Sequence, residues 1–313
     1  MSTTRRRFLS ATAASALTAT LAAPLRAMSS ATGTASPYMK TIGLQLWTVR
    51  NQMAADRDAT LQAIVDAGYK QVEMGVITDG GVELAKAARD LGLRVTSSFC
   101  DWNVFANPEK KGVASPQKVI DAAQKIGLDH IVFGYIGKGF RETPDQYKAI
   151  ADRCNAAAEK ARRAGIRLCY HNHSFEFKPF NNAVKQTSGP ASGNEMPTGF
   201  DVLMKRFDPE MEFELDVFWA AVGGWDPVQT MQRLDGRVSQ VHLKDLKRET
   251  PVLHDEGKVP AEAFQECGDG MLDMPKILEI SRKIGVSQCH VEQDQSPSPL
   301  KSIVQSIKYL HTA

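Results

Sequence analysis

Short apolar runs alternate regularly with longer, helix-like segments along this sequence, and this pattern limits the folds that it can adopt. The apolar runs have the length and composition of buried parallel strands. Eight such runs occur, at residues 41–47, 69–74, 93–99, 130–135, 166–172, 211–216, 238–243 and 288–293. Several of the segments between them end at glycines such as Gly68 and Gly127, as helices with left-handed caps do. Eight strand–helix units predict an α/β fold, a single (β/α)8 TIM barrel. A doubly wound open sheet is the alternative, but no glycine-rich dinucleotide turn follows the first run.

The first 36 residues stand outside this pattern. Three consecutive arginines, at residues 5–7, precede an alanine-rich run at residues 11–23 and a linker of small residues. This arrangement resembles a twin-arginine (Tat) export signal, with a disordered basic tail as the alternative. We therefore expect a signal peptide and linker at residues 1–36, a barrel domain at 37–313, the Tat machinery as a partner and a periplasmic location. The alanine-rich run is too short and too weakly apolar to span a membrane.

The charge of the chain argues against a nucleic-acid partner, and its cysteines argue against a disulfide framework or a zinc ribbon. The chain has a net charge of +2, but its first 27 residues contain four arginines and no acidic residue. Without those four, 34 basic residues face 36 acidic ones, a balance of −2. We therefore expect no nucleic-acid partner. The five cysteines are an odd number without a C-x-x-C pair, so they indicate neither a disulfide framework nor a zinc ribbon.

Carboxylates and imidazoles stand at the ends of five strand-like runs. These residues are Glu73, His171, Asp216, His242 and Glu292. A single residue of this kind is more often structural, but the carboxyl ends of barrel strands all meet at one mouth. Mixed carboxylate and imidazole groups suit one divalent ion such as Mn²⁺, Zn²⁺, Co²⁺ or Fe²⁺. Such an ion stabilises an enediolate while a nearby base removes the proton beside a carbonyl.

Six short motifs carry a resemblance to a known family. They are G-L-Q-L-W-T-V-R at residues 43–50, Q-V-E-M at 71–74, Y-H-N-H-S-F-E-F at 170–177, F-E-L-D-V-F-W at 213–219, V-H-L-K-D at 241–245 and H-V-E-Q-D at 290–294. In this order and spacing they resemble the xylose isomerase-like barrels, a family of sugar (phosphate) isomerases and epimerases that includes inosose dehydratase. The resemblance covers about residues 40–312.

The resemblance implies a set of metal ligands. In many relatives, strands five to eight supply Glu, Asp, His and Glu, of which the last three match Asp216, His242 and Glu292. Strand five departs from the pattern, because His171 stands where relatives have Glu. Either His171 replaces that Glu, or Glu176 turns back to the ion. Charge favours Glu176, since three carboxylates and one imidazole match the family's usual set, with His171 as an additional or substitute ligand.

The predicted catalytic residues flank this ion. His173 lies on the same side of an extended strand as His171, and it either acts as acid or base or holds a ligand in place. Lys244 is suited to bind a substrate hydroxyl or oxyanion. Together with Glu176 and Glu292, these two residues form the predicted catalytic set.

Four residues are predicted to bind substrate. Gln45 and Trp47 stand at the end of the first run, where Trp47 either stacks on a sugar or packs in the core. Glu73 either hydrogen-bonds the sugar or orients a neighbouring ligand. His171 completes the set.

The function that we expect is a metal-dependent sugar isomerase or epimerase. An exported protein without a glycine-rich phosphate loop favours a non-phosphorylated sugar or glycoside as substrate. A lyase or hydratase that performs β-elimination on a 3-keto-glycoside or an inosose-like substrate is the alternative. A non-catalytic sugar-binding protein is a more distant one, and an endonuclease for abasic DNA is opposed by the charge. The long connection at residues 247–272 is suited to form a lid or the contact of a homo-oligomer.

Overall fold

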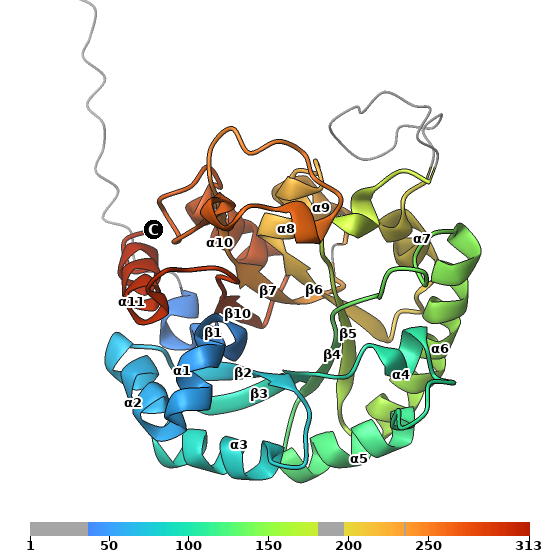
Figure 1. Ribbon diagram of the computed structural model, residues 1–313, viewed down its shortest axis with the longest axis horizontal. Coiled ribbons are helices and arrows are strands. Elements are labelled where there is room, and N and C mark those ends of the chain that lie inside the picture. The colour runs from blue at the N-terminus through green and yellow to red at the C-terminus, as the bar shows by residue number, and fades with distance from the viewer. Residues whose placement is uncertain (1–36, 181–196, 235) are drawn as a thin grey trace, which may run out of the picture. The chain divides into compact units, whose positions relative to one another are not determined.

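Eight parallel strands form a closed barrel in the computed structural model, which describes residues 37–180, 197–234 and 236–313. The strand order around the barrel is β1, β10, β7, β6, β5, β4, β3 and β2 (Figure 1). The predicted (β/α)8 barrel is therefore confirmed. The predicted signal peptide and linker lie outside the described residues, as do residues 181–196 of an insertion that the sequence predicts at 174–196.

Seven of the eight barrel strands lie within the predicted runs, most of them shorter by a few residues, and β2 is shifted by two residues. Their bounds are β1 (Gly43–Gln45), β2 (Gln71–Val76), β3 (Arg94–Phe99), β4 (His130–Phe133), β5 (Arg167–His171), β6 (Met211–Asp216), β7 (Val238–Leu243) and β10 (Gln288–Val291). All six residues of β6 are buried, as expected for a strand with helices on one face and the barrel interior on the other. Two further strands, β8 (Asp245–Leu246) and β9 (Phe264–Gln265), form an antiparallel pair beyond β7.

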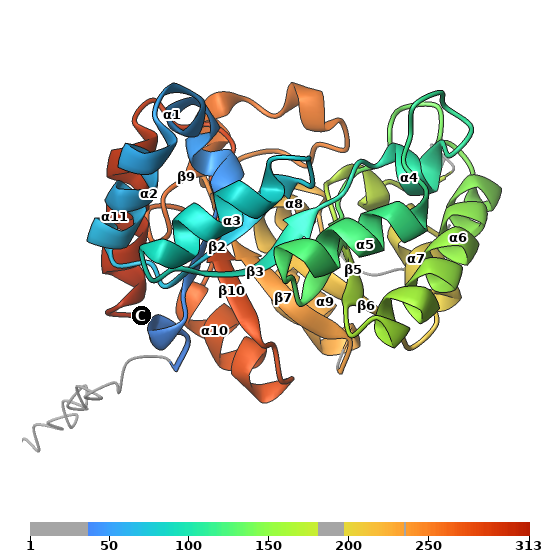
Figure 2. The same cartoon turned by 90° about the horizontal axis from the view of Figure 1, so that it is seen from below.

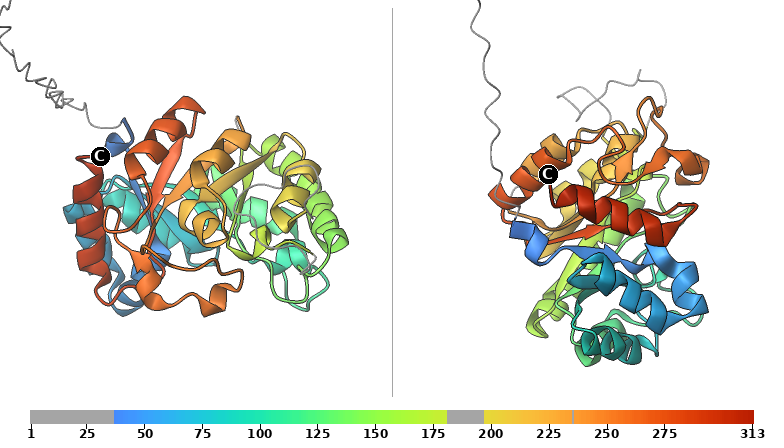
Figure 3. Two further views of the ribbon diagram at one scale, coloured as in Figure 1. Left: turned by 90° about the horizontal axis from the view of Figure 1, so that it is seen from above. Right: turned by 90° about the vertical axis from the view of Figure 1, so that its left-hand side faces the viewer.

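Helices cover the outside of the barrel (Figure 2). The principal ones are α1 (Arg50–Ala55), α2 (Arg57–Ala67), α3 (Gly81–Asp90), α5 (Pro116–Ile126), α6 (Pro144–Arg163), α7 (Gly199–Arg206), α9 (Pro227–Arg233), α10 (Met274–Lys283) and α11 (Pro299–Leu310). The last helix, α11, packs beside α2 (Figure 3). In the described ranges, no helix combines the length and apolar composition needed to cross a membrane.

Local signals set the helix ends. Gly68 and Gly127 adopt left-handed conformations, with φ of 109° and 77°, after α2 and α5 as predicted. Asp56 separates α1 from α2. Asp56 between them is extended, and its side chain accepts a hydrogen bond from the amide of Ala59 to cap α2. The short helices α4 (Asn103–Ala106) and α8 (Val217–Val222) were not predicted, since segments of this length carry no periodicity.

The interior of this barrel is polar, whereas TIM barrels are typically filled by branched apolar side chains. Thr96 donates a hydrogen bond to Gln288 at 2.5 Å, and Gln71 lies 3.2 Å from the ring of His290. The apolar core lies instead between the strands and the helices. A polar interior that leads to the carboxyl ends of the strands positions the site described next.

Candidate functional site

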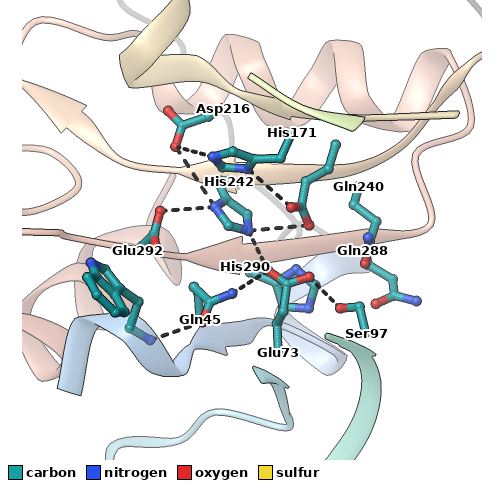
Figure 4. Close-up of polar contacts among 12 residues, drawn as sticks. Gln45, Glu73, Ser97, His171, Asp216, Gln240, His242, Gln288, His290 and Glu292 are labelled. Carbon is teal, nitrogen blue, oxygen red and sulfur yellow. Dashed lines mark hydrogen bonds and ion pairs between the residues drawn. The ribbon is translucent and has the colours of Figure 1, made fainter. Parts of the chain in front are cut away.

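The carboxyl ends of β5, β6, β7 and β10 bring together four of the predicted residues. His171, Asp216, His242 and Glu292 each offer one potential ligand atom, and these atoms lie within 4.8 Å of one another. The Nδ1 atom of His242 lies 3.1 Å from Glu292 and 3.9 Å from Asp216 (Figure 4). All four side chains are buried. The convergence predicted from the strand ends therefore holds for these residues.

The chemistry of this group fits a divalent ion. Two carboxylates and two imidazoles are a donor set that transition metals favour. One oxygen of Asp216, Oδ1, accepts a hydrogen bond from the amide of Trp219 at 2.9 Å and so caps α8. The other oxygen, Oδ2, faces the rings of His171 and His242 at 4.0 and 3.9 Å and the ammonium of Lys244 at 3.0 Å. The helix cap thus holds Asp216 with one oxygen directed at the group.

Glu176 does not belong to this group. The chain forms a short 3-10 helix, η3 (Phe175–Phe177), directly after β5. This turn directs the Glu176 carboxylate to the hydroxyl of Tyr170 at 2.5 Å and to the amide of His173 at 2.9 Å, and both donate to it. The structure thus brings His171, and not Glu176, to the other three residues. The preference for Glu176 as a metal ligand is not supported.

A second layer of polar groups lies beneath the first, around the other nitrogen of His242. Its Nε2 lies 2.7 Å from Glu73 Oε1 and 3.3 Å from Glu214 Oε1. Glu73, Glu214, His242 and His290 again present ligand-type atoms within 4.8 Å of one another. Glu214 and His290 were missed, although they stand two residues before Asp216 and Glu292. The alternation of side chains along a strand was the signal that pointed to them.

Two of the predicted substrate contacts belong to this lower layer. Glu73 and Gln45 are 0% and 1% exposed, and Gln45 donates a hydrogen bond to Glu73 at 2.7 Å. Ser97 donates a second hydrogen bond to the same carboxylate at 2.5 Å. In this arrangement Gln45 and Glu73 hold His242 in place. These contacts agree with the alternative stated for Glu73, orientation of a neighbouring ligand, and substrate binding by Gln45 stays a prediction.

Lys244 lies at the centre of the mouth with its side chain fully buried. Its ammonium is 2.6 Å from Glu292 Oε2 and 3.0 Å from Asp216 Oδ2. Asp294, which was not among the predicted site residues, is a third carboxylate in contact with this ammonium. Burial alone would lower the pKa of Lys244, but Asp216, Asp294 and Glu292 outweigh it and raise the pKa well above the usual range. Lys244 therefore carries a charge.

The histidines of the mouth differ in their protonation. Burial favours neutral rings, but the carboxylates of Glu214, Glu292 and Glu73 raise the pKa of His242 well above its ordinary value. Burial lowers the pKa of His171. For His173, burial and the charge of Lys244 lower the pKa to about 3. The rings of His171 and His173 are therefore neutral at pH 7, whereas His242 is charged.

Aromatic rings surround His173 beside the group. Its ring stacks on Phe175 with centroids 5.6 Å apart and packs against Trp219 at 5.1 Å and Tyr135 at 5.5 Å.

Trp47 is 50% exposed, which excludes the core role considered for it. Sugar stacking on Trp47 stays a prediction.

The connection after β7 extends across the mouth. Its 3-10 helix η4 (Glu256–Lys258) reaches the loop that follows β4. There, Arg141 donates two hydrogen bonds to Glu256, at 2.8 and 3.0 Å, and the Tyr135 hydroxyl donates a third at 2.8 Å. Lys138 pairs with Asp255 at 3.1 Å. Since β6 and β5 lie between β7 and β4 in the barrel, this segment forms a lid over that side.

The fold and the mouth group agree with a known family. Residues 61–312 match the model of the xylose isomerase-like TIM barrel family. The chain belongs to this family.

Relatives in this family share most of the length of the chain. Inosose dehydratases of Lacticaseibacillus casei and Clostridium beijerinckii are 23% and 24% identical to it, and each alignment covers 84% of this chain and 93% of the relative. A sugar phosphate isomerase/epimerase of Parabacteroides distasonis superposes with a TM-score of 0.69 at 25% identity, covering 92% of this chain and 97% of that one.

Proposed function

We propose that this protein is a divalent-metal-dependent enzyme that isomerises or epimerises a non-phosphorylated sugar by removing the proton beside a carbonyl. The observation that carries the proposal is the buried group of His171, Asp216, His242 and Glu292 at the barrel mouth. An ion bound there would polarise the carbonyl or adjacent hydroxyls of a sugar and stabilise an enediolate. The sugar-directed relatives in the family support this chemistry.

We assign proton transfer to His173. Its ring lies next to that of His171, with centroids 5.2 Å apart, and its Nδ1 accepts no hydrogen bond from the described residues. A neutral imidazole beside the reacting carbon is able to take a proton. Glu176 accepts a hydrogen bond from the main chain of His173, so it positions this residue. Lys244 keeps its charge and can donate a hydrogen bond to a substrate oxyanion.

A lyase or hydratase is the second candidate. It would remove the same proton and then expel a group from the β carbon of a 3-keto-glycoside or an inosose-like substrate. Two relatives that are inosose dehydratases favour it. The two candidates share the proton abstraction and differ in whether a leaving group departs.

The substrate that we propose carries no phosphate, and the enzyme binds it in the periplasm. Residues 244–248 after β7 and 292–296 after the last barrel strand contain no glycine, so neither segment has the composition of a phosphate-binding loop. The twin-arginine pattern at residues 5–7 supports export. Phosphorylated sugars are held in the cytoplasm, which favours neutral sugars or glycosides.

Metal analysis and isotope exchange test this function. The protein would be purified from the periplasm and its metal measured by mass spectrometry. Keto-sugars and 3-keto-glycosides would then be incubated with it in D₂O and followed by NMR. We expect about one ion per chain, and deuterium at the carbon beside the ketone only when the metal is present. Release of an aglycone would identify the lyase. Metal-free protein without exchange would contradict the proposal and leave a sugar-binding protein.

A further inference from the structure

Lys244 is an unusual neighbour for a metal site, because its ammonium lies among the atoms that would bind the ion. It contacts Asp216 Oδ2 at 3.0 Å and Glu292 Oε2 at 2.6 Å. These are the same two oxygens that face Nδ1 of His242, at 3.9 and 3.1 Å. The side chain of Lys244 is fully buried, with the rings of Phe218 and Trp219 at 5.7 and 5.5 Å from its nitrogen.

A divalent cation and this ammonium cannot share those oxygens without interacting strongly. Like charges a few ångströms apart repel, and the repulsion is large where water is excluded. When no ion is bound, the carboxylates of Asp216, Glu292 and Asp294 balance the charge of the Lys244 ammonium, since all three contact it. The two cations therefore compete for the oxygens of Asp216 and Glu292.

Asp294 is a carboxylate that can pair with the ammonium of Lys244 without being a potential ligand of the ion. Its main chain is held by Arg50, whose guanidinium donates a hydrogen bond to the carbonyl of Asp294 at 2.9 Å. Asp294 is thus a fixed anion at the edge of the group, toward which the ammonium can move by turning its flexible stem.

We propose that Lys244 is a built-in counter-ion that competes with the divalent ion for Asp216 and Glu292, and that Asp294 draws the ammonium aside when the ion enters. The site would then be charge-balanced without metal and would bind it in an exchangeable manner. This inference rests on the metal site of the proposed function.

Titration of the metal-free protein with Mn²⁺, followed by calorimetry, tests the competition. Lys244→Met removes the competing charge, and we expect it to bind Mn²⁺ at least tenfold more tightly than the wild type. Asp294→Asn leaves the ammonium dependent on Asp216 and Glu292, and we expect binding at least threefold weaker. Lys276→Met, on the surface of α10, is the matched control and leaves the affinity unchanged. Opposite effects of the two variants are not expected from general damage to the site.

Each other outcome has a definite meaning. Equal or weaker binding by Lys244→Met, while the wild type binds one Mn²⁺, overturns the competition and leaves the proposed function intact. Binding by Lys244→Met alone supports the competition and contradicts metal use by the wild type. Absence of binding in both overturns the two proposals together. Circular dichroism checks the fold, and should Lys244→Met not fold, unchanged or tighter binding by Asp294→Asn overturns the inference.

Discussion

Glu73 Oε1 lies 2.7 Å from Nε2 of His242, the ring whose other nitrogen faces the barrel mouth. Both nitrogens of the charged ring face carboxylates, so Nε2 donates to Glu73 and Nδ1 donates to Glu292, and a bound ion would take the place of the proton on Nδ1. The lower polar layer thus orients this ligand of the upper one and keeps the proton on Nε2.

We expect Glu73→Gln to weaken metal binding by about 10–100-fold, the range found when such supporting carboxylates are removed. The amide keeps the size of the side chain but loses its charge, so the tautomer of His242 is no longer determined. Calorimetric titration with Mn²⁺ measures the effect. Glu83→Gln, on the exposed face of α3, serves as the control. An unchanged affinity in Glu73→Gln would show that Glu73 has no part in orienting His242.

Asp216→Asn is expected to abolish stoichiometric metal while leaving the fold stable. The metal loses a charged ligand, but an asparagine oxygen caps a helix about as well as aspartate, so the cap on α8 is retained. The retained cap limits its own share of any change in the free energy of unfolding to about 1 kcal/mol, whereas loss of the buried ion pair with Lys244 is expected to lower the stability of the metal-free protein further. Metal analysis and thermal melting check the two parts separately. Full metal content in this variant would remove Asp216 from the ligand set.

His171 and Glu176 are expected to respond in opposite ways to substitution. His171→Asn removes a member of the mouth group and should reduce bound metal, whereas Glu176→Gln should keep it, because Glu176 faces Tyr170 and the main chain of His173. The metal content of the two purified variants shows which of the two residues binds the ion. Loss of metal in Glu176→Gln alone would restore the ligand set inferred from the family pattern.

The carboxyl group of Glu176 makes stability depend on pH. Burial raises its pKa from 4.5 to about 7, although hydrogen bonds from Tyr170 and His173 oppose the shift. The folded state therefore holds a proton that the unfolded state releases, and this contribution is present below pH 4.5 and is lost as pH rises to about 7. The loss amounts to about 3 kcal/mol.

Denaturant unfolding from pH 4.5 to 8 measures this dependence. Glu176→Gln imitates the protonated form, so we expect the difference in stability between variant and wild type to increase with pH. The conservative size of glutamine makes it a close match for the neutral acid. A difference that does not vary over this range would show that Glu176 is ionised in the folded protein.

The pairing of Arg141 with Glu256 is expected to hold the lid closed. Glu256→Gln weakens the two hydrogen bonds from Arg141, and charged hydrogen bonds contribute about 2 kcal/mol. We expect faster amide hydrogen exchange in the lid segment and an increased KM. Glu262→Gln, in the same connection but exposed, is the control. Exchange rates equal to those of the wild type would show that other contacts hold this segment.

Side-chain periodicity explains how far the site was predictable. Asp216, His242 and Glu292 stand at or directly after the ends of strands that the apolar runs already mark, so their convergence followed from the barrel alone. Glu214 and His290 lie in the same strands two residues earlier, but within apolar runs they were taken for parts of the strand. Asp294 was passed over because it follows the last barrel strand by three residues.

Composition and periodicity along the chain were enough to predict the alternation of strands and helices, the closed barrel and the strand ends that carry carboxylates and imidazoles. The contacts of the site were not predictable in this way: which nitrogen of His242 faces which carboxylate, that Glu176 turns away, and that Lys244 lies among three acids. His242 and Glu73 are 169 residues apart. Contacts over such separations depend on side-chain directions inside the closed barrel, and no local pattern encodes them.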